Sequence, residues 1–302
     1  MSTVFLFPGQ GSQHVGMGSD LYDRFPSARA VFDQADELLG YSLSALCFEG
    51  TEEELVETAV QQPAIFVVSV AAWQGVMEQT WATPHYVAGH SAGEFAALVA
   101  AQALTFSDGL ALIRRRGELM KQAGDNNPGA MSAILALDAE ITFELCQQAS
   151  ERTGRPVQIA NDNCPGQLVI SGDETALAMA ETLAKEAGAR KIVRLPISIA
   201  AHSVLMASVA DEFEKAVDET AVFPPKLPII GNVTAKPLQT IADVRAELKA
   251  QLTSSVMWTD SMRYLLAQGA DTFVEVGPGK TLLGLVKRLD RKTKRIKFGE
   301  DE

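Results

Sequence analysis

A serine stands at the centre of the pentapeptide Gly89-His90-Ser91-Ala92-Gly93, between an apolar run and an Ala-rich segment. This is the Gly-x-Ser-x-Gly pattern of a nucleophile elbow, in which a strand turns sharply into a helix and presents the serine hydroxyl. Glycines suit such a turn because they have no Cβ atom to clash there. Residues 86–88 are typical of a strand, and residues 94–101 are typical of a helix. The pattern therefore predicts a nucleophilic Ser91, with a serine in a purely structural turn as the alternative.

The composition is that of an acidic globular protein. Of 302 residues, 47% are apolar and 21% are charged, which is enough for one large domain with an insertion or for two domains. The formal net charge of -12 argues against a nucleic-acid binder, which usually carries a basic surface. The same charge disfavours adhesion to anionic membranes.

The cysteines and the apolar runs indicate a compartment. Cys47, Cys146 and Cys164 lie far apart, so we expect neither a disulfide framework nor a metal-ligand cluster. This usage favours a reducing environment. The apolar residues 4–7 are too few for a secretory signal, and no apolar run reaches the length of a membrane span. We therefore expect a cytoplasmic protein with no metal site and no membrane contact.

Strand and helix patterns alternate along the chain, which indicates α/β layers around a mainly parallel sheet. Residues 129–195 form a separate β-α-β-β-α-β series, the element order of a ferredoxin-like unit. The sequence thus predicts a large α/β domain built from residues 1–128 and 196–302, with the small unit inserted into it.

Three local patterns predict where elements begin and end. A long apolar helix over residues 63–79 is expected to begin at Pro63, because a missing amide costs nothing in the first helical turn. Ser107 and Asp108 are expected to cap the following long helix. Residues 161–166 are rich in turn formers and are expected to join two strands.

Two stretches resemble ligand sites for other reasons. Gly277-Pro278-Gly279-Lys280-Thr281 resembles a nucleotide loop, but the Walker pattern needs a glycine where Val274 stands, so we exclude nucleotide binding. Residues 287–297 are strongly basic. They predict a solvated helix end and tail, with a docking patch for an acidic partner as the alternative.

A serine nucleophile needs a base, and the chain has four histidines. His90 directly precedes Ser91, so its side chain should point away from the hydroxyl and play a structural part. His14 and His85 occupy expected surface positions. His202 follows the serine in the chain order of hydrolase-like folds and lies after an apolar run. By elimination, we predict His202 as the base.

Two further parts of a serine site are less defined. Asp211 and Glu212 are candidates for the group that orients the histidine, and a backbone carbonyl is an equal alternative because it can accept the Nδ1 proton. The loop Gly9-Gln10-Gly11-Ser12-Gln13 offers exposed backbone amides that could complete an oxyanion hole with the Ala92 amide.

Arg114, Arg115 and Arg116 follow one another in a helical segment. Three consecutive helical residues spread over about 300° of the circumference, so one arginine can face inward while the others remain exposed to solvent. A buried arginine would need an acidic partner, and a substrate carboxylate could be gripped bidentately by its guanidinium.

Taken together, these residues resemble one family. The resemblance runs from Val4 to Leu289 and depends on six motifs in order: Phe7-Pro8-Gly9-Gln10-Gly11-Ser12-Gln13, Gly89-His90-Ser91-Ala92-Gly93-Glu94, Arg116-Gly117, residues 161–167, Ala201-His202-Ser203 and Glu275-Val276-Gly277-Pro278-Gly279. The chain is similar to the malonyl-CoA:acyl carrier protein transacylases and the related acyltransferase domains of fatty acid and polyketide synthases. Each motif is weak by itself, but the set is specific.

The resemblance implies an α/β-hydrolase-like large subdomain, a ferredoxin-like small one and a role for each site residue. Ser91 would carry the acyl group and His202 would act as base and then acid. The amides of Gln10 and Ala92 would form the oxyanion hole, and Arg116 would pair with the free carboxylate of malonyl. The main-chain carbonyl of Gln251 would orient the histidine, and Gln62 would line the site.

The resemblance also implies substrates and partners. Malonyl-CoA would acylate the serine, and the phosphopantetheine thiol of an acyl carrier protein would take the group, in a ping-pong reaction without a further cofactor. Family members often carry a bulky residue before the catalytic histidine, where this chain has Ala201. Acceptance of methylmalonyl is therefore an open alternative.

Three other interpretations compete with a malonyl transferase of fatty acid synthesis. A polyketide acyltransferase would use the same residues. A serine hydrolase on this scaffold would use Ser91 and His202 but would not need Arg116. A catalytically silent docking module would need none of the three, so their joint presence disfavours it. A monomer is the default expectation for the oligomeric state.

Overall fold

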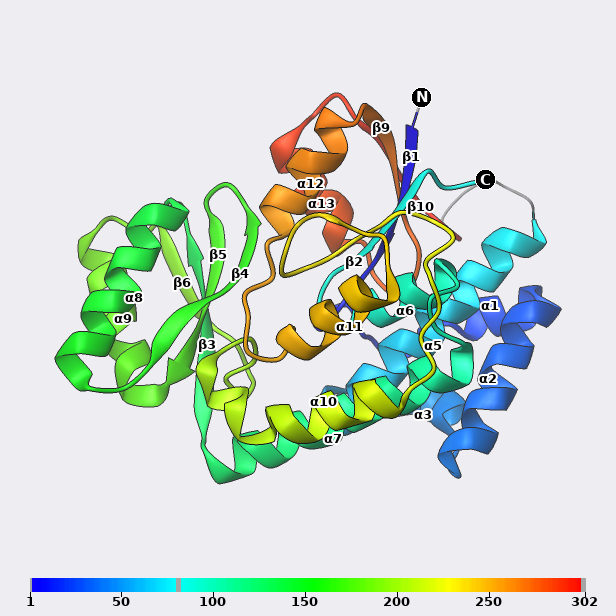
Figure 1. The fold of residues 1–302 in the computed structure, drawn as a ribbon, viewed down its shortest axis with the longest axis horizontal. Helices are drawn as coiled ribbons and strands as arrows, with labels where there is room; N and C mark the ends of the chain where they lie inside the picture. The colour runs from blue at the N-terminus through cyan, green and yellow to red at the C-terminus, as the bar shows by residue number, and fades with distance from the viewer. Residues whose placement is uncertain (1, 80–82, 300–302) are drawn as a thin grey trace.

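The computed structural model describes residues 2–79 and 83–299, whose arrangement Figure 1 shows. The larger of its two sheets has six strands in the order β10-β9-β1-β2-β7-β8. Neighbouring strands are parallel except β7 and β8, which are antiparallel. The strands are β1 (Ser2–Phe7), β2 (Tyr86–Gly89), β7 (Ile229–Ile230), β8 (Pro237–Leu238), β9 (Ala270–Glu275) and β10 (Lys294–Lys297).

The central strand β1 shows why this sheet lies inside the protein. Successive side chains of a strand point to opposite faces. Phe5 and Phe7 accordingly join one apolar core, while Val4 and Leu6 join a second core on the other face, and all four are fully buried. A strand buried on both faces reads as an unbroken apolar run, as β1 does. The predicted α/β architecture with a mainly parallel sheet is confirmed.

Helices cover both faces of the large sheet. The longest apolar one, α5, has residues 61–73 buried throughout and packs mainly against α7 and α2. No helix within residues 2–79 and 83–299 is long and apolar enough to cross a membrane. The helices outside the small sheet are α1 (Ser19–Arg24), α2 (Pro26–Leu39), α3 (Leu43–Glu49), α4 (Glu52–Val56), α5 (Thr58–Glu78), α6 (Gly93–Ala100), α7 (Phe106–Asn126), the 3-10 helix η1 (Val204–Val209), α10 (Ala210–Glu219), α11 (Ile241–Ala250), α12 (Trp258–Ala267) and α13 (Thr281–Leu289).

A second, four-stranded sheet has its own core at one end of the molecule, drawn in green in Figure 1. Its strand order is β4-β5-β3-β6, every pair is antiparallel, and α8 and α9 pack together against it. The elements run β3 (Gly129–Leu135), α8 (Ala139–Thr153), β4 (Val157–Cys164), β5 (Gln167–Asp173), α9 (Glu174–Glu186) and β6 (Lys191–Arg194). The predicted β-α-β-β-α-β series is confirmed.

The expected helix start at Pro63 is wrong. Helix α5 begins at Thr58, and Pro63 lies inside it. An internal proline loses one helical hydrogen bond and crowds the preceding turn, at a cost of about 3 kcal/mol. Burial of the residues around Pro63 against α7 outweighs that cost, which no local pattern could reveal.

Three other local predictions also need correction. The cap of α7 is Thr105, whose hydroxyl accepts from the Asp108 amide at 3.1 Å, and not the Ser107-Asp108 pair. Most of the expected turn at 161–166 belongs to strand β4, so β4 and β5 are joined by Pro165 and Gly166 alone. The expected C-terminal tail instead forms the edge strand β10, which pairs in parallel with β9.

The topology brings three loops to one edge of the large sheet. Strands β1, β2 and β7 are parallel neighbours, so the loops that follow their carboxyl ends lie side by side. These loops carry Gln10, Ser91 and Asn232. Strand β4 of the small sheet reaches the same region, because Asn161 forms a bridge with Val256.

Candidate active site

Ser91 lies at the turn between β2 and α6. Its φ is 51°, a value that residues other than glycine rarely adopt. The turn is so tight that a Cβ at Gly89 would overlap the Gly93 carbonyl, and one at Gly93 would overlap the Phe7 carbonyl. The amides of Gly93 and Glu94 then bond back to His90 and Ser91 and start the helix. The structure thus places Ser91 in the elbow geometry that the pentapeptide predicts.

His202 is the histidine that meets this serine. Its Nε2 lies 2.8 Å from Ser91 Oγ, and the two residues are 9% and 3% exposed. Its Nδ1 lies 2.9 Å from the carbonyl oxygen of Gln251 and 3.1 Å from that of Ser254. A carbonyl only accepts hydrogen bonds, so Nδ1 carries the proton and Nε2 is the acceptor for the Ser91 hydroxyl.

The two carboxylates considered as histidine partners lie elsewhere. Glu212 pairs with Arg115 at 2.6 Å on the exposed side of α7, and Asp211 is exposed. Within the part of the chain that the structure describes, His202 Nδ1 meets main-chain carbonyls and no carboxylate.

The environment of His202 favours its neutral form. Burial, the positive charge of Arg116 and the nearby His90 together lower the pKa of His202 to about 3, with burial as the largest cause. His202 is therefore neutral at pH 7, which is the state that can accept a proton from the serine hydroxyl. Its φ of 56° is also left-handed, so both partners of this hydrogen bond have unusual backbones.

Arg116 is 1% exposed and lies beside the serine. Its Nη2 donates to Ser91 Oγ at 3.2 Å and its Nη1 donates to Gln62 Oε1 at 2.8 Å. Its Nε has no hydrogen-bond partner among the described residues. Burial lowers the pKa of Arg116 to about 10, so the group is still charged at pH 7. No carboxylate of the described residues lies within ion-pair distance of this guanidinium, and Glu94 acts on its charge only from farther away. A buried cation without a direct ion-pair partner therefore faces Ser91.

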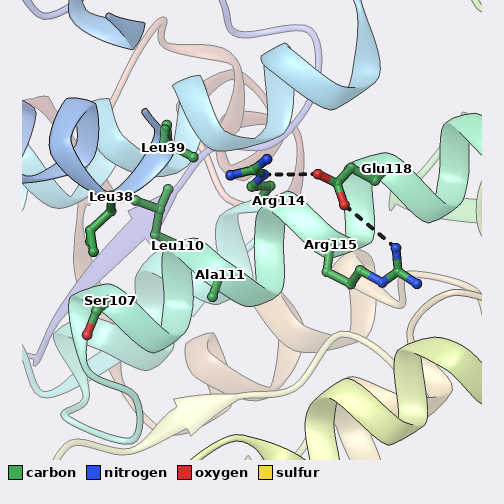
Figure 2. Close-up of a pocket in the computed structure, with 8 residues that line it drawn as sticks. All are labelled: Leu38, Leu39, Ser107, Leu110, Ala111, Arg114, Arg115 and Glu118. Atoms are coloured by element: carbon green, nitrogen blue, oxygen red, sulfur yellow. Dashed lines mark hydrogen bonds and ion pairs between the residues drawn. The ribbon is translucent and has the colours of Figure 1, made fainter. Parts of the chain in front are cut away.

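The other two arginines of the triplet point to solvent. Arg114 pairs with Glu118 at 2.9 Å, and Arg115 pairs with Glu212. Figure 2 shows both beside a shallow hollow between α2 and α7 that contains neither Ser91 nor Arg116. The prediction that one arginine of the three faces inward is confirmed.

Gln62 and Gln251 hold the groups around the serine in place. Gln62 accepts from Arg116 and donates from Nε2 to Met120 Sδ at 3.1 Å. Gln251 is fully buried, and its side chain donates to the Ser91 carbonyl at 3.3 Å while its own carbonyl accepts from His202. Gln251 therefore touches both sides of the Ser91–His202 pair.

The backbone amides considered for an oxyanion hole lie in the loops that follow β1 and β2 at the same edge of the large sheet. Ala92 is the residue before α6, and Gln10 lies in the exposed loop after β1, whose Phe7 pairs with Gly89 of β2. Among the hydrogen bonds of residues 2–79 and 83–299, none uses either amide as donor. Both N–H groups are thus free to meet an incoming oxygen.

Ala201 directly precedes His202 and is 5% exposed. It belongs to the main apolar core of the large sheet. A single methyl group therefore stands at this buried position next to the base.

The remaining histidines have the positions that the sequence predicts. His90 Nε2 lies 2.8 Å from Asn163 Oδ1, and its ring packs edge-on against Trp258. His14 and His85 are exposed. None of these three imidazoles hydrogen-bonds the serine within the described chain.

Sequence reasoning missed three residues whose hydrogen bonds support the backbone of Ser91 and His202. Asn232 accepts from the Ser91 amide at 2.7 Å, and Glu94 accepts from the Asn232 amide at 3.0 Å. Gln158 of the small sheet donates to the His202 carbonyl at 3.1 Å. A polar residue directly after the apolar strand β7 was the signal for Asn232, and a carboxylate in the apolar helix α6 was the signal for Glu94.

Comparison with known proteins matches residues 4–297 to the acyl transferase domain family. Over 299 residues the chain is 44% identical to the malonyl CoA-acyl carrier protein transacylase of Bacillus subtilis (strain 168), covering 99% of this chain and 94% of that protein. The chain belongs to the malonyl-CoA:acyl carrier protein transacylase family.

Solved structures of family members have the same fold. The malonyl CoA-acyl carrier protein transacylase of Coxiella burnetii is 37% identical with a TM-score of 0.96, covering 99% of this chain and 94% of that one. A malonyl-transacylase solved in complex with its type II PKS acyl-carrier protein is 36% identical with a TM-score of 0.94, over 98% and 95% of the two chains. The predicted family resemblance and fold class are confirmed.

Proposed function

We propose that this transacylase family member transfers the malonyl group from malonyl-CoA to the phosphopantetheine thiol of an acyl carrier protein, and so supplies fatty acid synthesis. The observation that carries the proposal is the buried Arg116, which lies 3.2 Å from Ser91 Oγ and has no carboxylate partner among the described residues. A malonyl group carries a free carboxylate that would supply the missing counter-ion.

In the first half-reaction, Ser91 Oγ attacks the thioester carbonyl of malonyl-CoA while His202 Nε2 takes the hydroxyl proton. The amides of Gln10 and Ala92 stabilise the oxyanion of the tetrahedral intermediate. The carbon–sulfur bond then breaks, and the CoA thiolate leaves with the proton from His202. Malonyl remains as an ester on Ser91, with its carboxylate on Arg116.

In the second half-reaction, the carrier-protein thiol gives its proton to neutral His202 and attacks the Ser91 ester. The same two amides stabilise the second oxyanion. The carbon–oxygen bond breaks, and Ser91 recovers its proton from His202. The carbonyls of Gln251 and Ser254 hold Nδ1 throughout, so Nε2 faces the serine in both directions.

The test is the intact-protein mass after brief incubation with malonyl-CoA, methylmalonyl-CoA or acetyl-CoA, beside a Ser91→Ala control. A malonyl adduct that is absent from the control and discharges onto holo acyl carrier protein supports the transferase. Free malonate and CoA released without an adduct would instead indicate a hydrolase.

The same experiment addresses the acyl group and the pathway. Ala201 leaves a small side chain beside His202, so a methylmalonyl adduct formed as fast as the malonyl adduct would mean that the site accepts an α-methyl group. A relative was solved with a polyketide carrier protein. Discharge is therefore compared on carrier proteins of the fatty acid and polyketide types, and faster discharge onto the former supports the proposed pathway.

A further inference from the structure

The strained backbone of Ser91 is stabilised by hydrogen bonds with a neighbouring side chain. A φ of 51° is unfavourable for serine, and such a backbone persists only where its surroundings over-determine it. The Ser91 amide donates to Asn232 Oδ1 at 2.7 Å, and Asn232 Nδ2 donates to the Gly89 carbonyl at 2.7 Å. One side chain thus binds two backbone groups of the elbow, the Gly89 carbonyl and the Ser91 amide, which lie just before the nucleophile in the chain.

Asn232 is itself fixed by partners from two elements. It is 1% exposed, its amide donates to Glu94 Oε1 at 3.0 Å, and its carbonyl accepts from the Met257 amide at 2.7 Å. Its Oδ1 faces an N–H group and its Nδ2 faces a carbonyl, so only one orientation of the side-chain amide satisfies both. Every polar group of Asn232 therefore has a partner.

Glu94 connects Asn232 to Gln251, which contacts His202. It is fully buried on α6, three residues after the nucleophile, and its Oε2 accepts from Gln251 Nε2. Gln251 also bonds the Ser91 carbonyl through its side chain and His202 through its main chain. One carboxylate thus reaches Ser91 through Asn232 and His202 through Gln251.

We propose that Glu94 and Asn232 are a buried positioning pair that holds Ser91 Oγ at hydrogen-bond distance from His202 Nε2. The hydrogen bonds of the two residues reach the elbow backbone and Gln251 and do not reach Arg116, so the pair acts on the reaction rate. A donor without a carboxylate separates this role from the effect of Glu94 on the charge of Arg116. The inference builds on the proposed function for the identity of the acyl donor, but its core concerns the reactivity of Ser91 alone.

The test compares Asn232→Ala, Asn232→Asp and Glu94→Gln with wild type in single-turnover acylation by malonyl-CoA and by the neutral ester p-nitrophenyl acetate. In the second reaction Ser91 Oγ bonds to the acetyl carbon, p-nitrophenolate leaves, and its release is read as a burst. A displacement of about 1 Å at a reacting group can cost on the order of 100-fold in rate. We therefore expect Asn232→Ala to acylate on the order of 100-fold more slowly with both donors, with little change in KM for malonyl-CoA.

The conservative variants keep the test decisive if the alanine variant does not fold. Asn232→Asp preserves the volume and the acceptor for the Ser91 amide but places an oxygen against the Gly89 carbonyl. Glu94→Gln preserves the volume but places a donor against the Gln251 amide or the Asn232 amide. We expect each to acylate about tenfold more slowly with both donors, since a buried donor or acceptor that loses its partner costs on the order of that factor.

Ser261→Ala is the matched control. Ser261 is buried beside the same loop, and its hydroxyl donates to the carbonyls of Gly231 at 3.4 Å and Met257 at 3.0 Å without contacting Ser91. A loss that comes only from a loosened loop would appear in this variant as well, and we expect none in the acylation rate.

A folded variant of the pair that acylates within about threefold of wild type on the ester overturns the inference, and so does an equal loss in Ser261→Ala. Wild type that reacts with the ester and not with malonyl-CoA contradicts the proposed function instead. The comparison of the variants on the ester still decides the positioning role in that case.

Discussion

The guanidinium of Arg116 donates to the hydroxyl of Ser91 over 3.2 Å, although both side chains are buried. An arginine beside a nucleophile opposes protonation of the neighbouring histidine and attracts a carboxylate to the reacting atom. The pairing thus links the basicity of the site to the choice of acyl group.

Replacing Arg116 by alanine should lower the activity with malonyl-CoA, whose acyl group is charged, and not the activity with acetyl-CoA, whose acyl group is neutral. A hydrogen-bonded ion pair in a buried site contributes about 1.5–3 kcal/mol, so we expect kcat/KM for malonyl-CoA to fall on the order of 100-fold. Acetyl-CoA has no carboxylate, and its transfer should be unchanged or faster. Arg115→Ala is the control, because Arg115 pairs with Glu212 on the surface. Equal losses for malonyl and acetyl would contradict the assigned role.

The acylation rate should hold steady in weak acid. The pKa of His202 is lowered to about 3, so the base stays neutral from pH 7 to pH 5. For a histidine with the ordinary pKa of about 6.5, the neutral fraction would fall roughly 25-fold over that range. The measurement is the burst rate with p-nitrophenyl acetate, whose own charge does not change. A decline centred near pH 6.5 would show that burial does not control this group.

The dependence of the acylation rate on pH should shift to higher pH when Arg116 is replaced. Its positive charge is a cause of the lowered pKa of His202, second to burial. Removing the charge therefore raises the pKa, and the acid decline of Arg116→Ala should begin at higher pH than that of wild type. An unshifted profile would mean that burial alone holds the histidine neutral.

Gln62 should contribute to malonyl-CoA binding because it holds the guanidinium of Arg116 in place. Gln62→Leu removes the acceptor that holds Nη1, and a hydrogen bond to a charged group is worth on the order of tenfold in binding. We expect KM for malonyl-CoA to rise by about that factor while the ester burst changes little. Gln61→Leu is a neighbouring control of the same size, since the buried Oε1 of Gln61 has no partner. Similar KM values for the two variants would argue against this role.

The elbow glycines should be indispensable for folding. A Cβ at Gly93 would overlap the carbonyl of Phe7 in β1, and overpacking of this kind costs about 3 kcal/mol. We expect Gly93→Ala to lower the thermal unfolding midpoint strongly or to be insoluble. Gly284→Ala is the matched control in helix α13, where nothing lies within 4 Å of an added Cβ. That change should stabilise by roughly 0.5–1 kcal/mol through helix propensity.

Local sequence patterns predicted the parts of the site that depend on local chemistry. The Gly-x-Ser-x-Gly turn identified Ser91 because few residue types fit an elbow, and elimination among four histidines left His202. Helical geometry implied that one arginine of three faces inward, but the family resemblance was needed to choose Arg116. The element order of the small sheet was also legible, because its alternating patterns are short and separated by clear turns.

Element boundaries were harder, because packing competes with propensity. Pro63 lies inside α5 since burial against α7 outweighs a proline's cost, and the basic residues from Lys294 to Lys297 form a strand because β9 offers an open edge. Neither neighbour is visible in the sequence around these residues.

Spacing, residue type and periodicity were enough to predict Ser91 as nucleophile and His202 as base, and to predict the two-sheet architecture. The contacts that hold these two residues in place became visible in the folded chain alone. Gln251 orients His202 through a main-chain carbonyl, which every residue possesses and no side-chain pattern marks. Asn232 reaches Ser91 across 141 positions of sequence. Glu94 accepts hydrogen bonds from both Asn232 and Gln251. Such contacts arise where parallel strands bring their following loops to one edge, and that proximity exists only once the sheet has formed.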